Sequence, residues 1–301
     1  MATVHDGAAT VREAVDRHPL VPLPHRVVSR RAWGADVVTL GLEPVDGEPI
    51  SYRCGQFAMV TAFGVGEVPL SFSSRSGPGP LEHTVRDVGA VTHALATAGP
   101  GDVVGVRGPF GTAWGVDELT GGSRAHDPVV VVGGGIGLAP LRGAIEVLTA
   151  TPDSARRTTV LVGARSPDQI VFDDDLDRWG AAGATVAVTV DAGARGWDGH
   201  VGVVTSLLGP RLASPERTTA LVCGPEVMIR FATRAIIAAG FWCLDMLILL
   251  LRGWPANRPA KCRAPYALGV EQSPCQPARR CKQPESRGEP ARPGPPLPPG
   301  V

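Results

Sequence analysis

The chain has 301 residues, of which 44% are hydrophobic and 19% are charged, and its formal net charge is zero. This length predicts about two domains with sizeable cores, and the balanced charge gives no general argument for binding to nucleic acid or to an anionic membrane. The charge is uneven, because residues 1–251 hold 20 arginines and 26 acidic residues, whereas residues 252–301 hold 9 basic and 3 acidic residues.

The amino-terminal segment is polar and lacks the apolar core of a secretory signal, and the six cysteines are scattered. We therefore expect a cytoplasmic, reduced protein rather than a disulfide framework. The longest apolar run, residues 241–251, contains Asp245 and has 11 residues, whereas a bilayer span needs roughly 20. We expect this run to be a buried strand or helix piece. The seven histidines show no zinc-ligand spacing, so no metal site is predicted from them.

Short β-branched stretches bounded by Gly, Pro or Asp dominate the chain from residue 25 to about 110. They follow an amino-terminal extension (1–21), in which residues 8–18 could form a helix, and they predict a domain over 22–118. The strands are expected at 25–33, 36–44, 57–63, 70–76, 81–87 and 103–108. Six short strands at this spacing indicate an antiparallel barrel, interrupted by one helix at 91–99.

The second half of the chain alternates nearly continuous apolar runs with helical patterns. Strands are expected at 129–133, 158–164, 185–191 and 218–224, and helices at 138–150, 173–182, 203–212 and 225–239. This alternation predicts a doubly wound parallel-sheet domain over 125–251. The polar stretch 117–127 suggests a hinge between the domains. Residues 253–301 contain 12 prolines, so we expect a disordered Pro/Arg-rich tail over 252–301.

Three consecutive glycines follow the first of these parallel strands, in the stretch GGGIGLAP (133–140). A helix N-terminus offers unpaired N–H groups, and a phosphate binds there when no β-carbon blocks its approach. The stretch therefore predicts a phosphate site, with a tight turn that binds nothing as the alternative. It departs from the ordinary dinucleotide fingerprint, because Leu138 or Pro140 replaces the last glycine and Arg165 follows the next strand where an acid is expected.

A barrel followed by an α/β domain with GGGIGLAP resembles the ferredoxin–NADP reductase superfamily. More closely, the chain looks like the flavin-containing gamma subunits of nickel–iron hydrogenases and sulfhydrogenases, over roughly residues 22–240. The motifs that carry the resemblance are VPLSFSS (68–74), VRDVGAVTHAL (85–95) with VRGPFG (106–111), GGGIGLAP (133–140) and CGPEVM (223–228).

The resemblance implies that FAD binds to the barrel. Ser71 matches the hydroxyl near flavin N5, and Val68 stands where many members have an arginine for the FAD diphosphate, which leaves the diphosphate to Gly89, Val91 and Thr92. The implied FAD-binding residues are Pro69, Leu70, Ser71, Phe72, Gly89, Val91 and Thr92. Simpler interpretations are an ordinary strand hydroxyl for Ser71 and a helix cap for Thr92.

The resemblance also implies that NAD(P) binds to the α/β domain, at Gly133, Gly134, Gly135, Ile136, Gly137, Pro140, Cys223, Gly224 and Pro225. Cys223 matches the turn beneath the nicotinamide, so Ser71 and Cys223 are the implied catalytic residues. The alternative for Cys223 is a small buried hydrophobe. Arg165 could grip a 2′-phosphate, but Asp168 and residues 173–175 would repel one, so the pattern leaves NAD and NADP open.

The carboxyl-terminal cysteines depart from the family. Gamma subunits usually end in closely spaced cysteines that bind a [2Fe–2S] cluster. Here Cys262, Cys275 and Cys281 are separated by 13 and 6 positions, so the expected cluster pattern is absent. We interpret the abrupt change of composition after about residue 241 as an out-of-frame or truncated reading.

The sequence thus predicts an FAD-dependent NAD(P)H oxidoreductase subunit in which hydride passes between nicotinamide and flavin. The resemblance implies that its partner is the metal-containing catalytic subunit of a hydrogenase-like complex. The alternatives are a catalytically silent flavin- and nucleotide-binding module for assembly or sensing, and a nicotinamide dehydrogenase without flavin, which the barrel argues against.

Overall fold

The computed structural model of the chain describes residues 20–209, 217–240 and 243–247. The predicted helix at 8–18, the predicted disordered tail, and Cys262, Cys275 and Cys281 lie outside the described residues.

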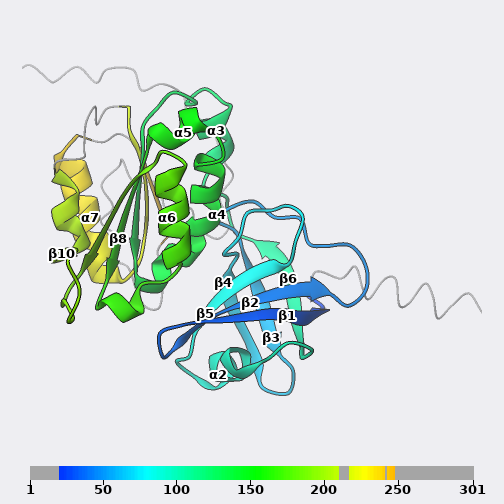
Figure 1. The fold of residues 1–301 in the computed structure, drawn as a ribbon. Helices are drawn as coiled ribbons and strands as arrows, with labels where there is room; N and C mark the ends of the chain where they lie inside the picture. The colour runs from blue at the N-terminus through cyan, green and yellow to red at the C-terminus, as the bar shows by residue number, and fades with distance from the viewer. Residues whose placement is uncertain (1–19, 210–216, 241–242, 248–301) are drawn as a thin grey trace, which may run out of the picture. The chain divides into compact units, whose positions relative to one another are not determined.

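The first part of the fold is an antiparallel sheet of six strands in the order β4-β3-β6-β1-β2-β5 (Figure 1). Its elements are β1 (Leu23–Trp33), β2 (Val37–Pro44), β3 (Phe57–Ala62), β4 (Gly66–Ser71), β5 (Leu81–Arg86), α2 (Ala90–Thr97) and β6 (Val103–Phe110). Phe72, just after β4, forms a bridge with His83 of β5, so the two ends of the sheet meet. The predicted six-stranded antiparallel barrel is confirmed.

The fourth strand begins earlier than the predicted 70–76. In β4 the exposed Glu67 and Pro69 alternate with the partly buried Val68 and Leu70, so the two-residue period already starts at Gly66. After Phe72 the chain turns through Gly77 and Gly79, both with positive φ, into β5. The run of small polar residues that we assigned to the strand therefore forms the connection.

The second part of the fold is a parallel sheet of six strands in the order β10-β9-β8-β7-β11-β12. Its strands are β7 (Val129–Gly134), β8 (Thr158–Ala164), β9 (Thr185–Val190), β10 (His200–Val201), β11 (Thr219–Cys223) and β12 (Cys243–Leu247). Its helical elements are η1 (Gly135–Leu138), α4 (Ala139–Leu148), α5 (Pro152–Arg156), η2 (Pro167–Gln169), α6 (Asp173–Ala181), η3 (Val204–Leu207) and α7 (Glu226–Ala238).

The doubly wound prediction is confirmed, because both faces of the parallel sheet are covered. Val131 of β7 packs in one core with residues of α4 and α6, whereas Val130 and Val132 pack in another with residues of η3 and α7. This double burial explains why the strands read as continuous apolar runs. The predicted helix at 203–212 appears as the four-residue η3, bounded by Gly202 and Gly209, and residues 210–216 lie outside the described ranges.

One hydrophobic core runs from the barrel into the α/β part. It joins Trp33 and Cys54 of the barrel, and Trp114 after it, to residues of β7, α4 and α6. The predicted hinge at 117–127 begins inside a short helix, α3 (Val116–Thr120), whose Leu119 is fully buried in this core. The polar composition of this stretch did not show that its first helical turn packs into the core through Leu119.

Candidate functional site

The four implied flavin-binding residues at 69–72 lie at the end of β4 and just after it. Two of them face the outside and the other two lie inside. Pro69 is exposed and Ser71 is partly exposed, whereas Leu70 packs against the barrel core. Phe72 is 1% exposed, and its ring stacks on Tyr52 with 3.8 Å between ring centroids. A flat ligand that approaches the strand from outside would therefore meet Pro69 and Ser71.

A buried histidine holds this strand from behind. The His83 Nδ1 lies 3.0 Å from the carbonyl oxygen of Ser71, which can only accept, so this nitrogen carries the proton. Its Nε2 is buried with no hydrogen-bond partner. Burial lowers the pKa of His83 to about 4, so the imidazole is neutral at ordinary pH.

The N-terminus of α2 lies beside the beginning of β4. The Thr92 hydroxyl accepts hydrogen bonds from the N–H groups of Val88 (3.0 Å) and Gly89 (2.9 Å), so this side chain caps the helix. The Cγ2 of Val91 would lie 3.0 Å from a β-carbon on Gly66, which places the helix start against the first residue of β4.

Gly89 itself is required neither by its backbone conformation nor by packing. Its φ of −172° is extended, and a β-carbon there would have no neighbour within 4 Å. The open space at the β-carbon position of Gly89 leaves room for an anion beside this helix start.

The glycine run lies at the carboxyl end of β7, where β8 pairs on one side and β11 on the other. Open α/β sheets bind ligands where the strand order reverses in this way. A β-carbon on Gly137 would lie 2.5–2.6 Å from backbone atoms of Cys223 and Gly224, and one on Gly134 would overlap Met228.

Two glycines of the run are therefore explained by the protein's own packing. Gly135 differs, because its φ is +53° and the nearest atom to its β-carbon position is Arg86 Nη2 at 3.8 Å. Gly137 is thus explained by the close approach of the β11 turn and Gly134 mainly by Met228 of α7, whereas Gly135 is the position left open.

The end of β11 exposes its turn but not its thiol. Cys223 is 0% exposed, and burial raises the pKa of its thiol to about 12. The implied direct role of Cys223 in chemistry therefore lacks an accessible sulfur, and the alternative of a small buried hydrophobe describes the side chain. Gly224 is partly exposed and Pro225 is exposed, beside the glycine run.

Sequence reasoning did not single out Arg86, although it lies within VRDVGAVTHAL. It is the last residue of β5, its Nε lies 3.3 Å from Asp36 Oδ2, and its Nη2 faces Gly135. A cation at the end of a strand, three residues before the glycine at a helix start, is the signal that could have marked it. Arg86 thus lies between the end of β5, which leads into the helix-start loop of the barrel, and the glycine run.

The chain is similar to subunits of known redox enzymes. Residues 131–234 match the family described as Oxidoreductase NAD-binding domain. Over 208 residues the chain is 30% identical to sulfhydrogenase 2 subunit gamma of Pyrococcus furiosus, covering 64% of this chain and 69% of that protein. Over 237 residues it is 32% identical to a probable dihydroorotate dehydrogenase B (NAD(+)) electron transfer subunit of Methanocella arvoryzae, covering 77% of this chain and 74% of that protein.

The chain belongs to the ferredoxin–NADP reductase superfamily. A solved structure agrees on the fold: the FAD/NAD-binding domain of a nitric oxide dioxygenase from Vibrio cholerae has a TM-score of 0.64 and 19% identity, and covers 75% of this chain and 99% of that one. As a superfamily member the chain is an oxidoreductase, and membership implies FAD and NAD(P) as cofactors. The outer face of β4, the open helix start at Gly89 and the partly exposed Gly135 fit these groups.

Among the described residues, no group of three or more His, Cys, Asp or Glu side chains could hold a metal ion. In the same part of the chain, no helix is long and apolar enough to cross a bilayer.

Arg165 is exposed at the carboxyl end of β8, and Asp168 is exposed nearby. The acids at the start of α6, which the sequence set against a 2′-phosphate, are already paired. Asp173 and Asp174 form ion pairs with Arg31, at 3.2 and 2.8 Å, and Asp175 pairs with Arg142. Their repulsion of a phosphate is therefore weaker than the sequence suggests.

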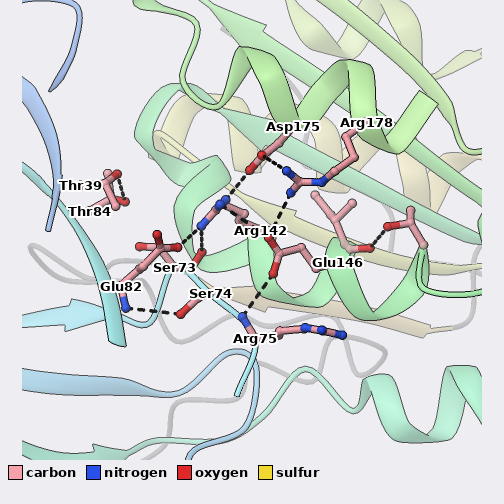
Figure 2. Close-up of polar contacts among 12 residues, drawn as sticks. Thr39, Ser73, Ser74, Arg75, Glu82, Thr84, Arg142, Glu146, Asp175 and Arg178 are labelled. Carbon is pink, nitrogen blue, oxygen red and sulfur yellow. Dashed lines mark hydrogen bonds and ion pairs between the residues drawn. The ribbon is translucent and has the colours of Figure 1, made fainter. Parts of the chain in front are cut away.

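A second group of polar side chains, also missed by sequence reasoning, lies where α4 meets the barrel (Figure 2). Arg142 of α4 pairs with Glu82 of β5, Asp175 of α6 and Glu146 one turn along α4. Burial alone would lower the pKa of Arg142, but the three carboxylates outweigh it and raise that pKa. Burial raises the pKa of Glu146, even though Arg142 and Arg178 oppose the shift.

Proposed function

We propose that the chain is the electron-transfer subunit of a larger redox complex, that FAD lies along β4, and that NAD(P) lies against the glycine run. The observation that carries the proposal is that Arg86 Nη2, at the end of a barrel strand, lies 3.8 Å from the position that a β-carbon on Gly135 would take. This proximity supports placing the two implied cofactor sites side by side, as hydride transfer requires. When bound, the nicotinamide supplies a hydride and the flavin can release electrons singly.

The dimensions of the barrel site favour FAD. Leu70 to Gly66 spans four residues, about 13 Å at roughly 3.3 Å per residue, and Gly66 abuts the start of α2. A flavin ring over Pro69 and Ser71 would therefore have its phosphates near Gly89 and Val91. Val65 and Val88, 50% and 76% exposed, flank this point in the sequence and offer apolar surface to an adenine.

The roles of the protein groups follow from these positions. Ser71 would donate a hydrogen bond to the flavin ring, with its backbone held by His83. The N–H groups at the start of α2 would bind the FAD diphosphate. Arg86, Gly135 and the Gly224–Pro225 turn would orient the dinucleotide. Hydride transfer needs no acid–base pair, so the task of the protein is to orient the cofactors and exclude water.

For the electron partner we propose the metal-containing catalytic subunit of a hydrogenase-like complex. The relative named sulfhydrogenase 2 subunit gamma supports this choice. A dihydroorotate dehydrogenase subunit is the second candidate, supported by the relative named dihydroorotate dehydrogenase B electron transfer subunit. Capture of the native complex with the tagged chain, followed by mass spectrometry, distinguishes them. A partner of neither kind would contradict both.

The decisive experiment is an anaerobic absorbance titration of the purified protein. We expect flavin bands that bleach on addition of NADH or NADPH, with FAD released on denaturation. Flavin bands untouched by both nucleotides would favour the silent binding module, and FMN alone would contradict the diphosphate site. Gly89→Leu should lower flavin occupancy, because its side chain would occupy the open space before the helix start. Gly99→Leu is the control, since its β-carbon also meets open space, at the other end of α2.

A further inference from the structure

α4 rests directly on the segment that follows β4, the strand along which we propose that the flavin lies and which we call the flavin strand. A β-carbon on Gly143 of α4 would overlap the carbonyl group of Ser74 and lie 3.0 Å from the N–H nitrogen of Arg75. Glycine inside a helix costs about 1 kcal/mol relative to alanine. The close approach of this backbone gives a reason for it.

Arg142, the neighbouring residue, bonds to the same segment from the side. Its Nη1 donates to the Ser73 carbonyl oxygen at 3.0 Å and pairs with Glu82, while its Nε pairs with Asp175 (Figure 2). The side chain is only 14% exposed. One rigid guanidinium thus joins the end of the β4 region, β5 and α6, which a lysine ammonium could not do with the same geometry.

We propose that Arg142 and Gly143 are positioning residues that set the distance between the flavin strand and the glycine run. Arg142 lies two residues after Pro140, the end of the glycine run, and its acceptor Ser73 lies two residues after Ser71. α4 therefore carries one cofactor site at its start and holds the other through its second turn. This inference rests on the proposed function.

Other contacts hold the two parts of the fold together without Arg142. Trp33 packs edge-on against Phe172 at 4.9 Å, and Arg31 pairs with Asp173 and Asp174. Altering the guanidinium should therefore shift α4 against the flavin strand rather than separate the parts. A misplacement of about 1 Å can slow a reaction by about 100-fold.

The test uses the full chain with two variants and a matched control. Arg142→Lys keeps the positive charge but loses the planar guanidinium that bonds to several acceptors at once. Gly143→Ala keeps every charge and pushes the Ser74 backbone away. Arg178→Lys is the control, because Arg178 belongs to the same network but its ion pairs, with Glu146 at 3.4 Å and Asp175 at 2.8 Å, lie within the α/β part.

The first readout needs no cofactor. Hydrogen exchange of the cofactor-free protein should be faster at the amide of Ser73, which donates to the Glu82 carbonyl oxygen at 2.7 Å, in Arg142→Lys and Gly143→Ala, and unchanged in Arg178→Lys. The second readout is rapid-mixing reduction of the flavin at saturating nucleotide. We expect the rate constant to fall at least about tenfold in the two variants, with unchanged flavin content and half-saturation within about twofold of wild type.

The outcomes separate the two proposals. A wild-type protein that holds flavin but is not reduced by either nucleotide overturns the proposed function, and this inference with it. A reducible wild type whose Arg142→Lys and Gly143→Ala variants keep its rate constant and its exchange overturns this inference alone. An equal loss in Arg178→Lys overturns it too, because the effect would then come from the charge network rather than from the contact with Ser73–Arg75.

Discussion

Gly135 is the glycine of the run at which backbone conformation, rather than packing, requires glycine. Its φ of +53° is strained for a β-branched residue, and its β-carbon position points toward Arg86 with 3.8 Å to spare. In contrast, Gly134 and Gly137 pack on the β11 turn. Packing therefore accounts for Gly134 and Gly137, and Gly135 is the glycine that we propose to face the dinucleotide.

Gly135→Val should abolish reduction by NAD(P)H while leaving the flavin bound, because the added side chain would lie where the dinucleotide passes Arg86. Flavin content and anaerobic bleaching measure the two effects. Gly47→Val is the control, since it places the same residue at φ +85° in open space. A Gly135→Val protein that nucleotide still reduces at the wild-type rate would remove this position from the site.

His83 makes the barrel sensitive to acid. Its pKa is about 4 in the folded protein and 6.5 in a model peptide, so the unfolded chain binds the extra proton first. The free energy of unfolding should therefore fall as the pH drops from about 6.5 to 4, by up to about 3 kcal/mol from this residue. Urea denaturation at a series of pH values measures the fall. His83→Asn should flatten it, and an unchanged slope in that variant would contradict the assignment.

Among the elements, the segment that leads into α4 lies in close backbone contact with the turn after β11. Gly137 precedes α4 and would carry a β-carbon 2.5 Å from the Cα of Gly224, whereas Gly180 in α6 is exposed and has no neighbour within 4 Å. Gly137→Ala should therefore destabilise the protein by more than about 1 kcal/mol. Gly180→Ala should stabilise it by about 0.5–1 kcal/mol. Thermal unfolding of the two variants should shift in opposite directions, and equal shifts would contradict the close approach.

The sequence predicted most elements because its patterns are local. Period-two alternation marks the barrel strands, and unbroken Val/Leu runs mark the parallel sheet. What it missed depends on distant partners. No local pattern shows that Leu119 and Trp114 enter the core of another element, that Arg142 reaches Ser73, or that Gly137 abuts Gly224. The sequence left open whether the Cys223 thiol is accessible for the same reason, because its burial depends on α4 and on the strands beside it.

For the described molecule as a whole, one apolar core contains residues of both the barrel and the α/β part, beside a core of the barrel's own. Trp33, Cys54 and Trp114 are all buried among residues of β7 and α4, and Trp114 Nε1 donates to the Pro140 carbonyl oxygen at 2.8 Å. We expect the cofactor-free chain to unfold in one transition, followed by calorimetry and by tryptophan fluorescence. Two separate transitions would show that the halves are independent domains.

The core that joins the two parts also limits which fragments and chimaeras of this chain can fold. A fragment that contains only the α/β half would expose the apolar surface that Trp33 and Trp114 now cover, and such a patch promotes aggregation. A chimaera that takes its barrel from another reductase would need matching side chains at these positions. We therefore expect the barrel and the α/β half to express and fold best when they are kept together in one chain.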